Sequence, residues 1–141
     1  MSRAHLTVNY NSSFFYMQTL NYWAKKFLKY LPLEVNTLVC KGMSGCAIAS
    51  AMCALSDRDL SVSVIRKKED TAHSSGHGGS YLSPSSSVAI VDDFTSTGET
   101  LKSILEGLSI FGVKPICIMM GCVDENIAPE IRHISIGTLE D

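Results

Sequence analysis

The sequence has no long hydrophobic run and very little net charge. No apolar stretch approaches the ~18 residues that a membrane-spanning helix needs, and the N-terminus lacks the apolar centre of a secretory signal peptide. The formal net charge is −2, which gives no reason to expect binding to nucleic acid. These absences favour a cytoplasmic protein.

Paired cysteine motifs are absent as well. The five cysteines are an odd number, none is spaced as CxxC, and each stands among apolar or small residues. A disulfide framework or a structural zinc site usually shows regular cysteine spacing in the sequence. We therefore expect reduced, buried thiols.

The apolar residues that are present predict alternating strands and helices. The chain has 141 residues, 45% hydrophobic and 18% charged, as is typical of one globular domain. Residues 67–85 are polar and are expected to form a loop without regular structure. The alternation predicts a single α/β domain, residues 1–141, with a doubly wound, mainly parallel sheet flanked by helices. Strands are expected at 36–40, 59–66, 87–91, 115–121 and 134–136, and helices at 14–31, 44–55, 98–111 and 127–132.

The segment Val88–Leu101, VAIVDDFTSTGETL, points to a class of ligand. A short apolar strand runs directly into Asp92 and Asp93, and a hydroxyl-rich turn then leads into a helix. Carboxylates can bind sugar hydroxyls, and a turn at a helix N-terminus can bind a phosphate. A capping box formed by Ser96 and Glu99 is a purely structural alternative. It would leave the two adjacent carboxylates and the threonines unexplained.

This segment resembles the signature of the type I phosphoribosyltransferases: a hydrophobic strand, two acidic residues, two usually aliphatic residues and a Thr/Ser-Thr-Gly-x-Thr loop. The sequence departs from it at Phe94 and Thr95, which replace the aliphatic pair. The resemblance implies that Asp92 and Asp93 contact the ribose hydroxyls of phosphoribosyl pyrophosphate (PRPP), with Asp93 also catalytic. The implied 5-phosphate ligands are Thr95, Ser96, Thr97, Gly98, Glu99 and Thr100. Glu99 would bind through its backbone, because its carboxylate would repel the phosphate and is expected to turn back to the helix terminus.

The resemblance extends over roughly residues 38–121 and implies two further loops of the site. After the first core strand, a short turn would bind pyrophosphate through Lys41, Gly42, Met43 and Ser44; taken alone, this turn is an ordinary strand-to-helix connection. The polar loop between residues 66 and 79 resembles in part the catalytic loop of orotate phosphoribosyltransferases. Ala72 stands near the place of an expected lysine. The implied catalytic residues of this loop are Arg66, Lys67, Lys68, His73 and His77.

The resemblance implies transfer of a phosphoribosyl group from Mg-PRPP to a nucleobase, with release of pyrophosphate. Orotate and a purine are both open as acceptors, because the chain leaves material for only a minimal hood over the base, in residues 1–16 and 122–141. Mg²⁺ would arrive with PRPP near Asp92 and Asp93, since no protein metal cage is visible in the sequence. A homodimer is compatible with the family. The alternative from another class is a non-catalytic PRPP or nucleotide sensor on the same fold.

Overall fold

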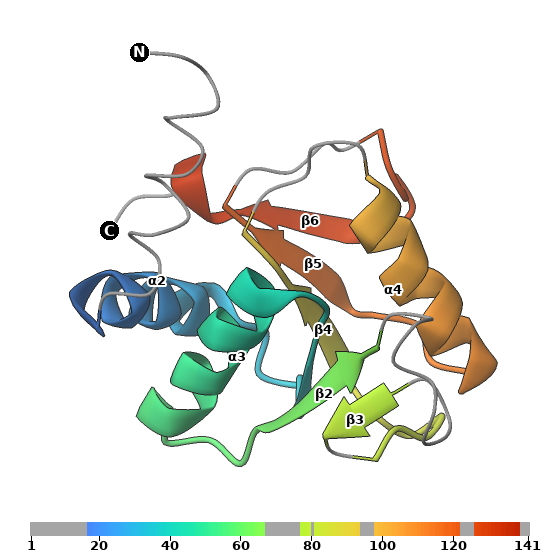
Figure 1. Ribbon diagram of the computed structural model, residues 1–141, viewed down its shortest axis with the longest axis horizontal. Coiled ribbons are helices and arrows are strands. Elements are labelled where there is room, and N and C mark those ends of the chain that lie inside the picture. The colour runs from blue at the N-terminus through green and yellow to red at the C-terminus, as the bar shows by residue number, and fades with distance from the viewer. Residues whose placement is uncertain (1–16, 67–76, 80, 94–97, 122–125, 139–141) are drawn as a thin grey trace.

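The computed structural model describes residues 17–66, 77–79, 81–93, 98–121 and 126–138 (Figure 1). Helices and strands alternate along most of this part of the chain. In chain order the elements are α2 (Met17–Tyr30), β1 (Thr37–Cys40), α3 (Met43–Leu55), β2 (Ser61–Ile65), β3 (His77–Gly79), β4 (Val88–Val91), α4 (Glu99–Ile110), β5 (Cys117–Met120), β6 (Arg132–Ser135) and the 3-10 helix η2 (Ile136–Thr138).

The strands form one six-stranded sheet in the order β3-β2-β1-β4-β5-β6. The five strands from β2 to β6 in this order are mutually parallel, and only the short edge strand β3 is antiparallel. The order runs outward in both directions from the β1–β4 pair, because β1 leads to β2 on one side and β4 leads to β5 on the other. The predicted α/β fold with a doubly wound, mainly parallel sheet is confirmed.

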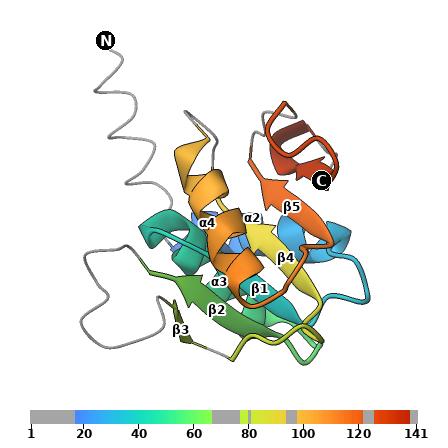
Figure 2. The ribbon, with the colours of Figure 1, turned by 90° about the vertical axis from the view of Figure 1, so that its right-hand side faces the viewer.

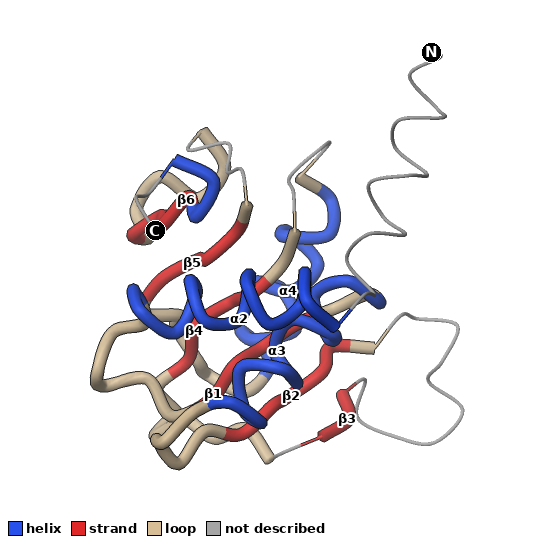
Figure 3. The backbone as a smooth tube through the Cα atoms, turned by 90° about the vertical axis from the view of Figure 1, so that its left-hand side faces the viewer, coloured by secondary structure: helices blue, strands red, loops and turns tan. Residues whose placement is uncertain are grey.

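Helices cover both faces of the sheet. Helix α4 lies in front of the strands in Figure 2, whereas α2 and α3 lie in front of them in Figure 3. Side chains alternate between the two faces along β4: Ala89 and Val91 belong to the cluster under α2 and α3, and Val88 and Ile90 to the cluster under α4. All four are fully buried, which explains why the strand is a continuous apolar run.

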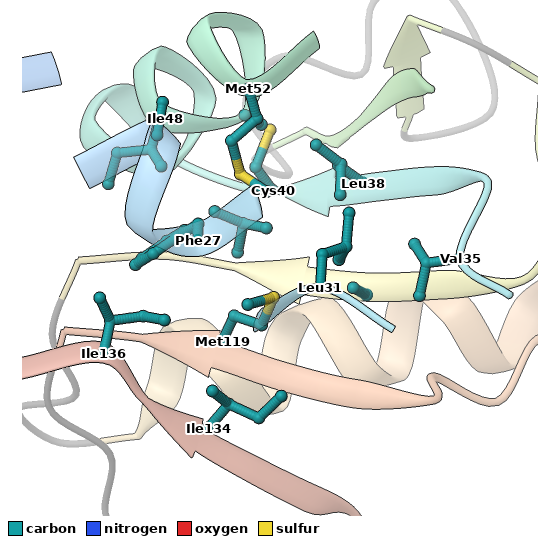
Figure 4. Close-up of a cluster of buried hydrophobic side chains, with 14 of the residues drawn as sticks. Phe27, Leu31, Val35, Leu38, Cys40, Ile48, Met52, Met119, Ile134 and Ile136 are labelled. Atoms are coloured by element: carbon teal, nitrogen blue, oxygen red, sulfur yellow. The ribbon is translucent and has the colours of Figure 1, made fainter. Parts of the chain in front are cut away.

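Helix α2 contributes the large side chains of one core cluster (Figure 4). Phe27 and Leu31 are buried, and Trp23 packs edge-on against Phe27 with the ring centroids 5.9 Å apart. This helical spacing was the basis for predicting the helix, and the helix ends at Tyr30, shortly before Pro32. Figure 4 shows that Met119 of β5 and Ile134 of β6 belong to the same cluster.

Two local predictions were wrong. Residues 127–131 form turns and bends instead of a helix, and Arg132 already begins β6; Pro129 disfavours helical geometry at Ala128, which has a φ of 52°. Ile127 and Ile131 still pack against the α4 cluster. The region 67–85 is not wholly irregular, because His77–Gly79 pairs with β2 as the edge strand β3. Such long-range pairing has no local sequence signal.

Two expectations from composition can be compared with the described residues. Cys40 and Cys117 are buried, as expected, whereas Cys46 and Cys53 are only half-buried, and Cys122 lies outside the described residues. Over the ranges that the structure describes, none of the helices has the length and apolar character needed to span a bilayer.

Candidate functional site

The doubly wound order creates a switch point between the carboxyl ends of β1 and β4. These strands are parallel neighbours, with Val39 opposite Ile90. The residues that follow them, Lys41 after β1 and Asp92 after β4, therefore leave the sheet side by side at one edge. Ligands of open α/β sheets bind at such a switch point. Helix α3 begins three residues after the end of β1 and α4 eight residues after the end of β4, so both helices start from this edge of the sheet.

Asp92 is a buried carboxylic acid at this edge, with only 5% of its surface exposed. Its backbone N–H donates to the carbonyl oxygen of Met119 over 3.1 Å, which continues the pairing of β4 with β5. Its Oδ1 accepts a hydrogen bond of 2.8 Å from the backbone N–H of Asp93. The pKa of Asp92 is raised to about 8, chiefly by burial and then by the Asp93 side chain, against the lowering effect of the Asp93 N–H. Asp92 therefore holds its proton at neutral pH in the unliganded protein.

The backbone of Asp93 is held by the segments that follow β5 and β6. The N–H of Gly121 donates to the Asp93 carbonyl over 2.6 Å, and the N–H of Gly137 donates to the Gly121 carbonyl over 2.9 Å. A Cβ on Gly121 would lie 2.7 Å from the Asp93 oxygen and 2.9 Å from Cη2 of Trp23. Gly121 thus permits a close approach of three segments. It also places the half-buried Trp23 ring beside the carboxyl edge of the sheet.

Gly98 begins helix α4 and is held in a tight position. Its φ of 81° and ψ of −1° are left-handed, and its carbonyl accepts the first helical hydrogen bond from Lys102 over 2.9 Å. Because the N-cap is Gly98 and Glu99 is the first helical residue, the capping box of Ser96 and Glu99 is wrong: it would require Ser96 as N-cap. The glycine cap supplies no side-chain hydrogen bond to the helix terminus.

The remaining residues of the hydroxyl-rich turn divide into two groups. Glu99 and Thr100 are exposed in the first turn of α4. Thr95, Ser96 and Thr97 lie outside the described residues. Glu99 and Thr100 both belong to the N-terminal turn of α4, where backbone N–H groups and the helix dipole favour an anion.

We expect Gly98→Ala to destabilise the protein by about 2–4 kcal/mol, because left-handed backbone strain and a steric clash add together. The new Cβ would overlap Cδ1 of Ile127, which must move to admit it. Gly112→Ala is the matched control: Gly112 has a φ of 71°, but the nearest atom to its added Cβ is 3.5 Å away, in Pro84. Urea unfolding should show a clearly smaller loss for the control, and Ile127→Ala should partly rescue Gly98→Ala. Equal losses in the two glycine variants would contradict the clash.

Lys41 and Gly42 form the turn between β1 and α3. Gly42 has a φ of 85° and a ψ of 167°, a conformation open essentially to glycine alone, and it is the N-cap of α3. The Lys41 ammonium donates a hydrogen bond to Oγ of Ser103 in α4. Lys41 is half-buried, Met43 is exposed and Ser44 is half-buried. The turn is thereby tied to the helix that follows the acidic pair. Ser103 carries no motif signal, so sequence reasoning missed it.

The two ends of the basic loop return to the same edge of the sheet. Arg66 directly follows β2, and His77 begins β3 opposite Ile65. The carboxyl end of β2 adjoins that of β1, since Cys40 pairs with Val64. The structure therefore brings Arg66 and the backbone of His77 to the corner beside the Lys41 turn. Lys67, Lys68 and His73 lie outside the described residues.

No group of three or more His, Cys, Asp or Glu side chains that could hold a metal ion occurs within the described ranges. Asp92 and Asp93 can offer hard oxygen donors. A divalent cation at this edge would need most of its ligands from a bound anion or from water.

Comparison with known proteins finds similarity in structure. No family model and no curated protein sequence matches the chain. The fold is similar to that of UMP synthase from Leishmania donovani, with 18% identity, a TM-score of 0.67 and coverage of 86% of this chain but only 27% of that one. Orotate phosphoribosyltransferase from Mycobacterium tuberculosis in complex with PRPP is 15% identical, with a TM-score of 0.69 and coverage of 87% of this chain and 75% of that one.

A third similar structure is named for a different base, adenine. Adenine phosphoribosyltransferase from Thermoanaerobacter pseudethanolicus is 14% identical, with a TM-score of 0.62 and coverage of 84% of this chain and 80% of that one. The five parallel strands and the flanking helices match the fold of these structures over most of the chain. The chain therefore has the type I phosphoribosyltransferase fold.

Proposed function

We propose that this chain is a phosphoribosyltransferase, acting as a single domain of residues 1–141, that moves the phosphoribosyl group of Mg-PRPP to a nucleobase and releases pyrophosphate. The observation that carries the proposal is the switch point: Lys41–Gly42 and Asp92–Asp93 leave neighbouring strands side by side. The first pair leads to α3 on one face of the sheet, and the second pair leads to α4 on the other face. This is where a ligand with a sugar and two separate phosphate groups can be held along one edge.

The acidic pair would hold the ribose. Two vicinal hydroxyls are good donors to carboxylate oxygens, and the buried position of Asp92 strengthens such hydrogen bonds. To accept from both hydroxyls, Asp92 must lose the proton that it holds at neutral pH. The pKa of Asp92 in the free protein is about 8. Below that pH, ligand binding would therefore be coupled to release of a proton.

The two phosphate groups would occupy the two helix termini. The 5-phosphate would fit the N-terminus of α4, where the first backbone N–H groups and the helix dipole favour an anion and the threonine-rich turn would supply hydroxyl donors. The pyrophosphate fits the turn of Lys41 and Gly42, with one ammonium group and the N-terminus of α3. Arg66 and the basic residues after it would face the departing pyrophosphate and neutralise its charge.

Asp92 and Asp93 could hold Mg²⁺ only together with oxygens of the substrate, and the ion would then neutralise charge on the pyrophosphate. The protein's own part is then positioning. The acidic pair fixes the ribose, the two helix termini fix its phosphates, and the anomeric carbon is left open to attack from the opposite side by a ring nitrogen of the base. Positive charge developing on the ribose would be stabilised by the neighbouring carboxylates.

The acceptor base is proposed to be orotate or a purine. The basic loop favours orotate, whereas the fold is shared by proteins named for orotate and for adenine. The half-buried Trp23, which lies against Gly121 at the carboxyl edge, offers an aromatic surface near the space where a base would sit.

The test is to mix the full chain with Mg-PRPP and, separately, orotate, uracil, adenine, guanine, hypoxanthine and xanthine, and to measure release of pyrophosphate. Turnover with one base supports the proposal and names the acceptor. PRPP binding by calorimetry without turnover of any base would instead favour a regulatory sensor. Absence of PRPP binding by a folded protein would reject both functions.

We expect Lys41→Met to weaken Mg-PRPP binding by about tenfold or more, because a charged hydrogen bond contributes about 1.5–3 kcal/mol. Ser103→Ala is the matched control, since Ser103 is the partner of Lys41 but lies outside the proposed pyrophosphate contacts. Calorimetry should show a much smaller loss for Ser103→Ala. If both variants lose stability equally and bind PRPP alike, Lys41 serves only to tie the turn to α4.

A further inference from the structure

Two thiols face each other beneath the turn of Lys41 and Gly42. Cys40 is the last residue of β1 and is fully buried, and Cys46 is in the first turns of α3 and is half-buried. The Sγ of Cys40 donates a hydrogen bond to the Sγ of Cys46 over 3.0 Å. The segment between them contains the whole proposed pyrophosphate turn, Lys41–Ser44.

We propose that Cys40 and Cys46 form a redox modification site, in which a low-molecular-weight disulfide such as oxidised glutathione converts them reversibly to an intramolecular disulfide. The geometry requires little movement. The two sulfur atoms must approach by about 1 Å to reach a disulfide length of ~2.05 Å. The cysteines sit on the adjoining ends of a strand and a helix joined by a short turn that includes Gly42.

The environments of the two thiols divide the chemical roles. Cys46 is the more accessible thiol, and the hydrogen bond from Cys40 lowers its pKa to about 7 against the opposing effect of burial. Its position near the N-terminus of α3 also favours the thiolate. The hydrogen bond to Cys46 and burial raise the pKa of Cys40. Cys46 is therefore the attacking thiol, and Cys40 is the resolving thiol.

The reaction balances in two exchanges. The Cys46 thiolate attacks one sulfur of oxidised glutathione, which forms a mixed disulfide and releases one glutathione thiolate. That thiolate takes the proton of Cys40, whose sulfur then attacks Sγ of Cys46 and releases the second glutathione. Two protein thiols are oxidised by two electrons, and one glutathione disulfide is reduced to two thiols.

Closure would disturb the proposed substrate site, and this consequence rests on the proposed function. Gly45 fits tightly against β4: a Cβ there would be 2.9 Å from the carbonyl oxygen of Val91 and 3.2 Å from Oδ1 of Asp92. Because Gly45 is held against β4, a movement of Cys46 toward Cys40 would be taken up by the neighbouring turn of Lys41 and Gly42. We expect the oxidised protein to bind Mg-PRPP on the order of tenfold more weakly, since displacements near 1 Å misplace substrate contacts.

The modification itself is tested by incubating the full chain with mixtures of reduced and oxidised glutathione, quenching with acid, alkylating the remaining thiols and mapping the peptides by mass. We expect a cross-link between Cys40 and Cys46 that dithiothreitol reverses. In Cys40→Ala, which lacks the resolving thiol, one glutathione should accumulate on Cys46. Cys46→Ala should form no cross-link at Cys40, and the control Cys53→Ala should still form the Cys40–Cys46 disulfide.

Two results would overturn the proposal. One is recovery of both thiols alkylated from the wild-type chain under conditions that fully oxidise dithiothreitol. The other is a folded Cys40→Ala variant, verified by thermal unfolding, that takes up no glutathione on Cys46. Should that variant not fold, the wild-type peptide map decides alone. A reduced protein that does not bind Mg-PRPP would reject the proposed function, whereas the peptide map would still decide the disulfide.

Discussion

Replacing Asp92 and Asp93 together by asparagine is expected to abolish measurable binding of Mg-PRPP while the fold stays intact. Hydrogen bonds to charged groups contribute about 1.5–3 kcal/mol each, so loss of two carboxylates should weaken binding by about a hundredfold or more. The asparagine oxygen at position 92 can still accept the hydrogen bond from the following N–H, which is 2.8 Å long in the wild-type protein. Calorimetry measures the binding, and circular dichroism during heating measures the fold.

The matched control carries the same chemical change at the opposite edge of the sheet. Asp57 and Asp59 are exposed and precede β2 at its amino end. Asp57→Asn with Asp59→Asn should therefore leave PRPP binding unchanged. Near-wild-type binding by the Asp92 and Asp93 double variant would remove these residues from the ribose site. Loss of binding accompanied by loss of cooperative unfolding would show that the acidic pair holds the fold, not the ligand.

Asp92→Asn is expected to make folding stability less dependent on pH. The pKa of Asp92 is about 8 in the folded protein against an ordinary value of 3.8, mainly because of burial. Between these values the folded state retains a proton that the unfolded state loses, so the stability that this group contributes is complete below about pH 4. It is lost as pH rises toward 8. The expected slope is about 1 kcal/mol per pH unit.

Urea unfolding of both proteins at pH 5, 6, 7 and 8 measures this effect. The wild-type free energy of unfolding should fall relative to that of Asp92→Asn as pH rises, until the variant is the more stable protein by several kcal/mol near pH 8. The exposed Asp59→Asn serves as control and should run parallel to the wild type. Parallel curves for the wild type and Asp92→Asn would mean that Asp92 is ionised at neutral pH in the folded protein.

The sequence by itself determined most of the local elements and the position of the acidic pair at the end of a strand. Val88–Val91 could be predicted as a buried strand because all four residues are apolar and bury on alternating faces of a covered sheet. The acidic pair was placed correctly because it follows that strand directly. Helix α2 could be predicted because Phe27 and the other apolar residues of this segment recur at helical spacing. These features depend on residues close together in the chain, so their periodicity is visible without the fold.

Only the tertiary structure decided which distant residues meet. The pairing of β1 with β4 brings Lys41 beside Asp92, and the packing of helices places Ser103 on Lys41. Burial at the switch point, which no local pattern reveals, raises the pKa of Asp92 to about 8. The same packing sets the Sγ of Cys40 within hydrogen-bonding distance of the Sγ of Cys46. Such contacts depend on strand order and on exclusion of water, and both are properties of the whole fold.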